Sequence, residues 1–552
     1  MIRRHTLYLA TAMLSVLVVS CGLPKPHPGI VSTRDGTPLA TDVFLPKESD
    51  IQPPYPAILV RTTYNKDAGR AGVTMAQMIA KQYTERGYTL VVQDTRGRFG
   101  SAGVDSIFLT DGAGYSRDGY DTIEWITQQP WSDGQVGMWG VSAQAITSYL
   151  AAASGHPALK CAWVTMGGSN LYHDIFYPGG VFRSRMVDTW VTGQGRADFL
   201  PFIHSHSSYD RHWQGVDITN HASGVRTAFY HTGGWFDCMS VGQTRGFKAL
   251  HESGGEGAKG QQMLVMGPWS HAGTGRTQGE LTFPDNNATI KLNKETFAWF
   301  DHHLKGETNT IDSLPPVRYY LMGDVDDSTA PGNVWLSADS WPPAGVKDRS
   351  FFFGDNGGLN ESASVSKAPD SYSYDPRNPV PTLGGLNLFQ PIGPADLTSI
   401  ETRDDVVSYT TPPLTEPLAV VGPVGVTLWA SSSAEDTDFM AMLTDVYPDG
   451  RSMLILDGPI RARHRDSFTE ETPMSPGQAY EFEIDLWETA LVFNKGHRIR
   501  VDITSSSSPR FKVNPNAVAA GDTVVAVNTI YHDGARPSSI TFAVLPPEAT
   551  TP

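Results

Sequence analysis

Short apolar segments alternate with helical segments from about residue 55 onwards. The strand-like segments lie at residues 57–60, 89–92, 136–140, 227–232 and 263–266, and the helical ones at 72–87, 118–128, 143–153, 241–251 and 294–305. A strand pattern followed by a helix pattern is typical of βα units. Because these units repeat, the sequence predicts an α/β fold, in which helices cover both faces of a parallel sheet.

The alternation stops between residues 169 and 226. This stretch is rich in aromatic and polar residues, contains Pro178-Gly179-Gly180 and has no clear period. Since the strand pattern resumes at residue 227, we expect an insertion. The prediction is an α/β domain made of residues 28–168 and 227–311, with an inserted cap over 169–226.

Beyond Pro315-Pro316 the helical pattern nearly disappears. Short apolar runs recur there between Pro, Gly, Asp and Ser clusters, for example at 317–321, 426–429 and 499–503. Short strands at such spacing are typical of a β-sandwich or jelly roll. We therefore expect a second, all-β domain over residues 312–552.

The first residues have the composition of a secretory signal. Two arginines precede an apolar run over residues 7–19, which is too short to cross a bilayer comfortably. The segment Val18-Val19-Ser20-Cys21 resembles a bacterial lipobox, which implies removal of residues 1–20 and a lipid anchor on Cys21. The expected location is the bacterial cell envelope, on its periplasmic or extracellular face. The alternative is an ordinary signal peptide in which Cys21 is incidental.

Charge argues against one class of partner. The chain has 58 acidic and 42 basic residues, which gives a net charge of −16. A nucleic-acid surface needs clustered Lys and Arg, so we expect no nucleic-acid partner.

Two cysteines remain after the signal segment. Cys161 begins one predicted strand, whereas Cys238 follows the end of another. If these strands are parallel neighbours, the thiols lie at opposite edges of the sheet, too far apart for a disulfide. We expect two buried free thiols.

Ser142 is the strongest candidate for a catalytic residue. Gly140-Val141-Ser142-Ala143 stands between an apolar strand and an Ala-rich helix, where a serine on a sharp turn is exposed above the carboxyl edge of the sheet. A serine at this place also serves as a helix cap, and Gln144 stands where the G-x-S-x-G motif has its second glycine. The strand and helix context favours a nucleophile.

A serine nucleophile needs a base, and the base needs an acid that orients it. In this type of fold the acid and then the histidine follow the serine along the chain. Asp237 and His271 each follow a predicted strand. Singly, an Asp after a strand is usually a turn residue and a His near a proline is usually at the surface. Their order and their shared position at strand ends predict a Ser-Asp-His triad.

The chain resembles the X-Pro dipeptidyl-peptidase and cocaine-esterase (CocE/NonD) family of serine hydrolases. The motifs that carry the resemblance are RTTY (61–64), QDTRGR (93–98), DGYD (118–121), QPWS (129–132), GMWGVS (137–142), GWFD (234–237), GPWSH (267–271), DTDF (436–439), PDGR (448–451) and GHRIR (496–500). The resemblance implies an α/β-hydrolase domain with an inserted helical cap, followed by a C-terminal jelly roll.

The resemblance also implies roles for individual residues. These are the nucleophile Ser142, the acid Asp237, the base His271, an oxyanion hole formed by the Tyr64 hydroxyl and the backbone N–H of Ala143, and an acyl-pocket wall at Trp269. Two positions depart from the family. Ala143 replaces an aromatic residue, which leaves a smaller pocket wall. Ala145 replaces a glycine, and its methyl fits if the helix sits slightly further out.

The implied reaction is hydrolysis of a carboxylic ester or acyl amide through a covalent acyl-enzyme, with no cofactor. The alternatives within the family are an X-Pro dipeptidyl-peptidase-like aminopeptidase and an α-amino acid ester hydrolase, which bind a substrate ammonium through carboxylates. Residues 238–241, directly after Asp237, include no acid, which favours a small-molecule ester or amide without a free amine. A non-catalytic, glycan-binding lipoprotein is the alternative outside this class.

Other polar clusters have weaker patterns. His204-Ser205-His206 and His302-His303 lack a Cys or carboxylate at ligand spacing, so we expect no catalytic metal. The acidic run 435–438 is expected to be a solvated loop, with a calcium site as the alternative. The oligomeric state is left open by the sequence.

Overall fold

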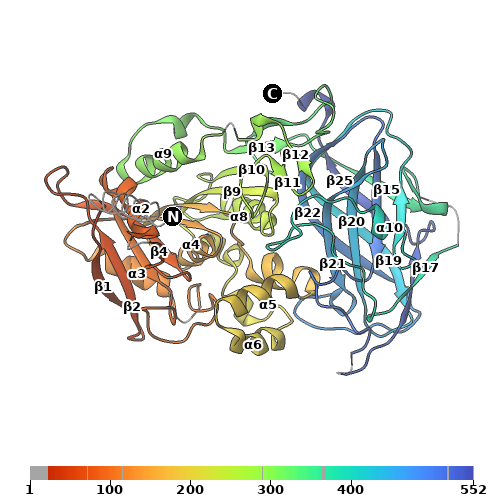
Figure 1. Cartoon of the computed structure of the whole chain (residues 1–552), viewed down its shortest axis with the longest axis horizontal. Helices are drawn as coiled ribbons and strands as arrows, with labels where there is room; N and C mark the ends of the chain where they lie inside the picture. The colour runs from red at the N-terminus through yellow and green to blue at the C-terminus, as the bar shows by residue number, and fades with distance from the viewer. Residues whose placement is uncertain are drawn as a thin grey trace, which may run out of the picture.

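A mixed sheet organises the N-terminal half of the chain (Figure 1). The computed structural model describes residues 23–70, 73–114, 116–288, 290–363, 368–518 and 521–550, and within these residues ten strands pair in the order β1-β2-β6-β3-β7-β8-β9-β10-β13-β14. Their bounds are β1 His27–Ser32, β2 Pro38–Phe44, β3 Tyr55–Thr62, β6 Thr89–Asp94, β7 Ser132–Val141, β8 Leu159–Thr165, β9 Ala228–Phe236, β10 Met263–Ser270, β13 Val317–Leu321 and β14 Val334–Ala338. The predicted signal segment and Cys21 lie outside the described residues.

The central strands of this sheet are parallel, as the sequence predicts. All neighbours from β6 across to β13 run parallel, whereas β1, β2 and β14 run antiparallel to their neighbours. The sequence pattern did not predict the first two strands. In β1 a single position is buried and the others are exposed or half-buried, so the alternation of apolar and polar residues is weak. Two short antiparallel pairs stand apart from this sheet among the described residues: β4 (Gly69–Arg70) with β5 (Val73–Thr74), and β11 (Thr277–Gln278) with β12 (Leu281–Thr282).

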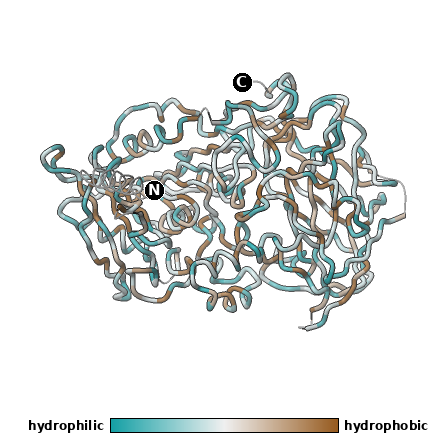
Figure 2. The backbone as a smooth tube through the Cα atoms, viewed as in Figure 1, coloured by the Kyte–Doolittle hydropathy of each residue, from teal (hydrophilic) through white to brown (hydrophobic). Residues whose placement is uncertain are grey.

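Helices cover both faces of the sheet. Those on one face are α2 (Met75–Thr84) and α9 (Leu292–Lys305), and those on the other are α3 (Asp118–Thr127), α4 (Ala143–Ala153) and α8 (Ser240–Ser253). Successive side chains of β3 pack on opposite faces of the sheet. Leu59 packs with α3 and α4, whereas Val60 packs with α2 and α9. Apolar segments accordingly run along the strands of both halves of the molecule (Figure 2). In the described ranges, no helix has the length and apolar character that a bilayer crossing requires.

The inserted segment forms a helical cap between β8 and β9. It consists of the π-helix η1 (Leu171–Phe176), the helices α5 (Ser184–Gly193), α6 (Leu200–Ser205) and α7 (Arg211–Gln214), and the short 3-10 turns η2 (Pro178–Gly180), η3 (Ala197–Phe199) and η4 (Ile218–Gly224). In Figure 1, α5 and α6 lie beneath the sheet, next to the C-terminal half. The predicted helical cap is therefore confirmed.

The C-terminal half is built from β-strands. In the part of the chain that the structure describes, eleven strands pair in the order β17-β24-β19-β25-β15-β16-β18-β23-β20-β21, with β22 added beside β19. They are β15 Lys347–Gly354, β16 Gly358–Asn360, β17 Asp370–Tyr374, β18 Val407–Thr410, β19 Leu418–Ser432, β20 Asp438–Val446, β21 Ser452–Arg461, β22 Tyr480–Phe493, β23 Arg498–Thr504, β24 Ala526–Tyr531 and β25 Ser539–Val544, with the short helix α10 Thr398–Glu401. The all-β prediction is confirmed, and the jelly-roll connection stays a prediction.

β13 and β14 belong to the N-terminal sheet, although both lie beyond the predicted domain boundary. β13 pairs parallel with β10, with Leu264 opposite Val317, and β14 pairs with β13. The N-terminal sheet thus extends to Ala338, beyond the predicted boundary at residue 312. An apolar run such as 317–321 identifies a strand, but it does not identify the sheet to which the strand adds.

The two halves share one hydrophobic core. A continuous cluster of buried side chains includes Trp235 and Leu264 of the first sheet together with Val426 and Phe482 of the second. The Trp235 ring stacks on Trp341 with 5.3 Å between ring centroids. No layer of solvent-exposed side chains therefore separates the two sheets along this described seam.

The cysteine prediction is confirmed for the described residues. Cys161 and Cys238 are both buried and free. Cys161 lies opposite Ala228 at the start of β9, whereas Cys238 follows the other end of that strand. Ten residues of extended chain place the two thiols roughly 30 Å apart.

The acidic run at 435–438 is not a solvated loop. Asp436 and Asp438 are almost fully buried. The Arg461 guanidinium donates to both oxygens of Asp438, at 2.8 and 2.9 Å, and Asn514 donates to both carboxylates. The structure gives no support to the calcium alternative, because Arg461 already pairs with Asp438 and Arg463 with Asp436. The spacing along the chain could not reveal these two arginines.

Candidate active site

Ser142 occupies a tight turn between β7 and α4. The strand ends at Val141, the helix begins at Ala143, and Ser142 has φ 58° and ψ −122°, a left-handed conformation that is uncommon for a residue with a side chain. A Cβ on Gly140 would lie 2.3 Å from the backbone of Gln144, so only glycine permits this approach of strand and helix. The turn lifts the serine hydroxyl off the end of the sheet.

The start of α4 supplies backbone donors beside the serine. The Ser142 carbonyl accepts from the N–H groups of Ala145 and Ile146, at 2.9 and 3.1 Å. The N–H of Ala143 belongs to the first helical residue, which lies outside the i to i−4 ladder. It therefore remains available at the positive end of the helix dipole.

His271 and Asp237 come to Ser142 from two neighbouring strand ends. Asp237 directly follows β9 and His271 directly follows β10. The Nε2 atom of His271 lies 3.0 Å from Oγ of Ser142, and Nδ1 lies 2.7 Å from Oδ2 of Asp237. The structure thus brings together the three side chains that the sequence order singled out.

Asp237 is fixed within the protein. Its side chain is fully buried, and Oδ1 accepts from the N–H of Met239 at 2.7 Å while Oδ2 faces His271. One carboxylate oxygen is therefore held by the backbone and the other by the imidazole. This arrangement fixes the orientation of the His271 ring.

Cys238 is a neighbour of the triad that the sequence reasoning did not assign. One donor atom from each of Asp237, Cys238 and His271 lies within 4.8 Å of the others. Burial lowers the pKa of the His271 imidazole, but Cys238 and Asp237 act in the opposite direction, and the net pKa is well above its ordinary value. The buried carboxylate thus favours the imidazolium that a general base becomes.

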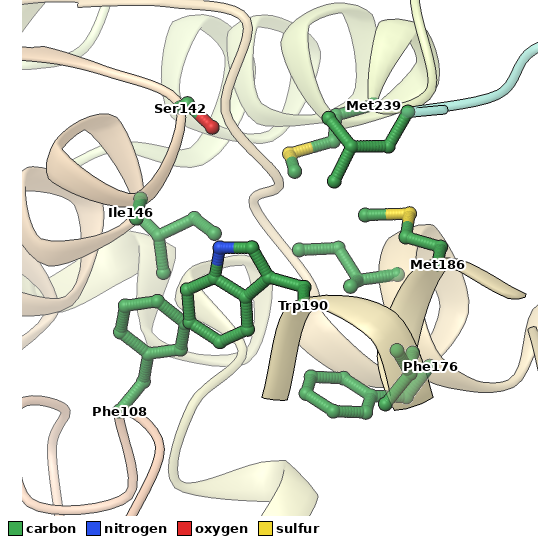
Figure 3. A pocket seen from close by; sticks show the side chains of 11 residues that line it. Phe108, Ser142, Ile146, Phe176, Met186, Trp190 and Met239 are labelled. Carbon is green, nitrogen blue, oxygen red and sulfur yellow. The ribbon is translucent and has the colours of Figure 1, made fainter. Parts of the chain in front are cut away.

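An apolar pocket opens beside the Ser142 hydroxyl. It contains about 390 Å³ of empty space, part of it open to solvent, and is lined by Phe108, Ser142, Ala143, Ile146, Ile175, Phe176, Met186, Val187, Trp190, Met239 and Leu388. Figure 3 shows Ser142 at one side of this space, with Trp190, Met186 and Met239 facing it. Among these described lining residues none is charged.

The pocket walls come from segments far apart in the sequence. Met186 and Trp190 lie on α5 of the cap, Phe108 lies in the segment before α3, and Leu388 comes from the C-terminal half. In the sequence, the high aromatic content of the cap was the feature that could have identified Trp190 as a pocket residue. No local pattern marks Phe108 or Leu388 as pocket residues.

Trp269 does not line this pocket, so the role implied for it is corrected. Its side chain is 2% exposed and belongs to the core beneath α9, where it packs on Trp335 with 5.7 Å between ring centroids. A Cβ on Gly267 would lie 2.3 Å from the Trp269 ring, so the ring fills the space over Gly267 of its own strand.

Tyr64 lies two residues beyond the end of β3 and is 39% exposed. Its hydroxyl accepts a hydrogen bond of 3.1 Å from Nε1 of Trp190, one of the pocket residues. The hydroxyl therefore does more than face solvent, and it is held against the wall of the pocket that contains Ser142.

Ala145, which stands where the family has glycine, is fully buried. A Cβ on Gly167 would lie only 2.6 Å from the Ala145 methyl. Room for that methyl is thus provided by the glycine opposite it, on the loop after β8.

Comparisons with known proteins agree with this geometry. The model for X-Pro dipeptidyl-peptidase (S15 family) matches residues 35–200 and 192–273, and the model for the X-Pro dipeptidyl-peptidase C-terminal non-catalytic domain matches residues 309–541. The chain is 34% identical to cocaine esterase of Rhodococcus sp. (strain MB1 Bresler), over 94% of this chain and 98% of that protein.

Solved structures show the same fold over nearly the whole chain. An aminopeptidase from a marine sediment Thaumarchaeota archaeon superposes with a TM-score of 0.78 at 24% identity, covering 95% of this chain and 97% of its own. An α-amino acid ester hydrolase superposes with a TM-score of 0.77 at 24% identity, covering 94% and 96%. The esterase relative and both family models establish that the chain belongs to the CocE/NonD, X-Pro dipeptidyl-peptidase family and is a serine hydrolase of ester or amide bonds.

Proposed function

We propose that the protein hydrolyses esters of uncharged, apolar carboxylic acids, with Ser142 as nucleophile, His271 as general base and Asp237 as the carboxylate that orients the base. The observation that carries the proposal is the pocket beside Ser142, because its described walls are apolar. An acyl group that enters this pocket gains hydrophobic contact and needs no charged partner. The Rhodococcus relative is itself an esterase.

Acylation starts with the 3.0 Å contact between Ser142 and His271. Nε2 of His271 takes the proton as Oγ of Ser142 attacks the ester carbonyl, and the carbonyl oxygen becomes an oxyanion. The N–H of Ala143 and the Tyr64 hydroxyl are the proposed donors to that oxyanion. Collapse of the intermediate breaks the bond to the alcohol, which leaves with the proton from His271.

Deacylation uses the same groups in the same order. Water gives a proton to His271 as its oxygen attacks the acyl-enzyme, and the proton then returns to Ser142 as the acid departs. Asp237 stabilises the imidazolium in both halves of the reaction, since its buried carboxylate lies 2.7 Å from Nδ1. Every proton is thus accounted for by residues of this chain.

The pocket disfavours the aminopeptidase-like alternatives. Recognition of a substrate ammonium in a buried site requires a carboxylate or a comparable partner. None of the described residues that line the pocket is an Asp or Glu. The glycan-binding alternative without catalysis is wrong, because the chain belongs to a serine hydrolase family.

A pair of matched substrates tests the acyl preference. Phenylacetic acid methyl ester and phenylglycine methyl ester differ by one amino group at the α-carbon. We expect kcat/KM for the amine to be no higher than for its uncharged partner and the two values to lie within about tenfold, or ~1.4 kcal/mol. A hundredfold preference for the amine would reveal a carboxylate that reaches the substrate from outside the pocket and would exclude the proposed acyl class.

Tyr64→Phe tests the oxyanion hole. Loss of one oxyanion donor typically lowers kcat by about 10²–10³, whereas KM should change little because the bond forms mainly in the transition state. The variant also loses the hydrogen bond from Trp190. Trp190→Phe removes that bond while keeping the tyrosine hydroxyl, so this control should retain kcat within about tenfold. A loss below fivefold in Tyr64→Phe would leave Tyr64 as a packing residue.

We also propose that the enzyme is held at the bacterial cell envelope by a lipid on Cys21. The proposal is supported by the basic start, the short apolar run and the Val18-Val19-Ser20-Cys21 segment. Incorporation of labelled palmitate by intact cells, and its loss in Cys21→Ser, is the measurement that tests it. A freely soluble, unlabelled wild-type protein would support an ordinary signal peptide instead.

A further inference from the structure

The cap contains a second cluster of donor groups that the proposed reaction does not use. His206 follows the end of α6, Asp210 directly precedes α7, and His212 lies in the first turn of α7. One donor atom from each of these residues lies within 4.8 Å of the other two. We infer that this cluster is a binding site for a divalent transition-metal ion, with zinc as the reference ion.

The three side chains already converge. Nδ1 of His206 lies 2.5 Å from Oδ2 of Asp210, and the two imidazole rings are 4.6 Å apart between centroids. Donors in a tetrahedral zinc site are about 3.4 Å apart when each zinc–nitrogen bond is about 2.1 Å long. Small side-chain rotations, together with loss of the proton between His206 and Asp210, therefore admit an ion.

Hydrogen bonds and ring packing already hold the groups around the cluster in place. Oδ1 of Asp210 accepts from the N–H of His212 at 2.9 Å and so caps α7, which leaves Oδ2 for a ligand. Nε1 of the buried Trp213 donates to the His206 carbonyl at 2.8 Å. The Phe202 ring packs against both imidazoles, at 4.2 and 5.3 Å between centroids. Such preorganisation lowers the entropy lost when an ion binds.

The donor set selects the class of ion. Two imidazoles and one carboxylate suit zinc, cobalt, nickel, copper and iron, whereas magnesium and calcium prefer oxygen donors. All three residues are partly exposed, so water can complete the coordination. The net charge of −16 also favours accumulation of cations around the protein.

This site shares only His206 with the His204-Ser205-His206 cluster of the sequence. His204 does not join it, because its Nε2 lies 3.6 Å from Asp188 on α5. The expectation that no carboxylate stands at ligand spacing is wrong, since Asp210 follows His206 by four residues and the chain turns there between two helices. An ion would join α6 to α7, and α6 contacts the helix that carries Trp190.

Calorimetric titration of the tag-free full chain, stripped with a chelator, tests the inference. Zinc should occupy one tight site in the wild type that magnesium does not fill. His206→Gln and His212→Gln should each weaken zinc binding at that site at least tenfold, because loss of a group that merely supports a ligand already costs 10–100-fold. His204→Gln is the matched control and should bind zinc as the wild type does.

Unfolding temperatures measured without metal show whether each variant is folded. Variants with the wild-type unfolding temperature and no tight zinc site support the inference. Zinc binding that is absent from the wild type, or that persists in both His206→Gln and His212→Gln, would overturn it. In the latter case the ion would belong to the cluster of Asp237, Cys238 and His271 and would inhibit ester hydrolysis.

Discussion

Ser142→Ala is expected to abolish ester hydrolysis and labelling by a fluorophosphonate probe. Loss of the nucleophile in a serine hydrolase lowers kcat by about 10⁶. Thermal unfolding should change little, because alanine keeps the Cβ of Ser142 at φ 58° and His271 keeps its hydrogen bond to Asp237. Rates of a p-nitrophenyl ester, probe labelling and the unfolding temperature are the measurements.

A serine at the other end of α4 supplies the control. Ser154 follows the end of α4, and its hydroxyl donates to the Ala151 carbonyl. Ser154→Ala should label and turn over substrate as the wild type does. Turnover above a few per cent of wild type in Ser142→Ala would show that another serine performs the reaction.

Asp237→Asn is expected to lower kcat by about 10⁴. The N–H of Met239 donates to Oδ1 at 2.7 Å, so it will hold the amide oxygen and turn the amide NH₂ towards Nδ1 of His271. Nδ1 then accepts a hydrogen bond, and the proton moves to Nε2, the atom that must take the proton of Ser142. The imidazole is thus kept in the wrong tautomer while the fold is unchanged.

A carboxylate elsewhere in the same domain serves as the comparison. Asp121 on α3 forms an ion pair with Arg34 at 2.7 Å near the surface. Asp121→Asn should lower kcat less than fivefold, since it touches neither Ser142 nor His271. Similar losses of kcat in both variants would mean that Asp237→Asn destabilises the fold rather than changing the tautomer of His271. Single-turnover rates and unfolding temperatures of the two variants give this comparison.

The sequence could predict the catalytic geometry because its determinants are local. Each strand carries its own apolar signal, and the ends of parallel strands meet at one edge of a sheet, so Ser142, Asp237 and His271 had to converge. The pocket could not be predicted in this way. Its walls meet only after the cap and the C-terminal half fold against the sheet, as Leu388 shows.

The sequence also could not predict which strands pair with each other. The run at 317–321 has the same apolar character as the strands of the C-terminal sheet, yet it pairs with β10. Trp269 was misplaced for a related reason, because a position in a motif does not show to which side of the sheet a ring turns. Both errors concern long-range packing, which spacing along the chain does not encode.

The core that the two halves share has a consequence for cooperativity. A break near Pro315 would strip β13 from the first sheet and uncover Trp235 and Leu264, which are almost fully buried in the whole protein. Neither fragment would have a complete interior, so each would tend to aggregate rather than refold. The triad residues all lie in the N-terminal half, to which the C-terminal half adds a pocket wall at Leu388. The catalytic half nevertheless depends on the C-terminal half for its own interior, and the two should unfold in one transition.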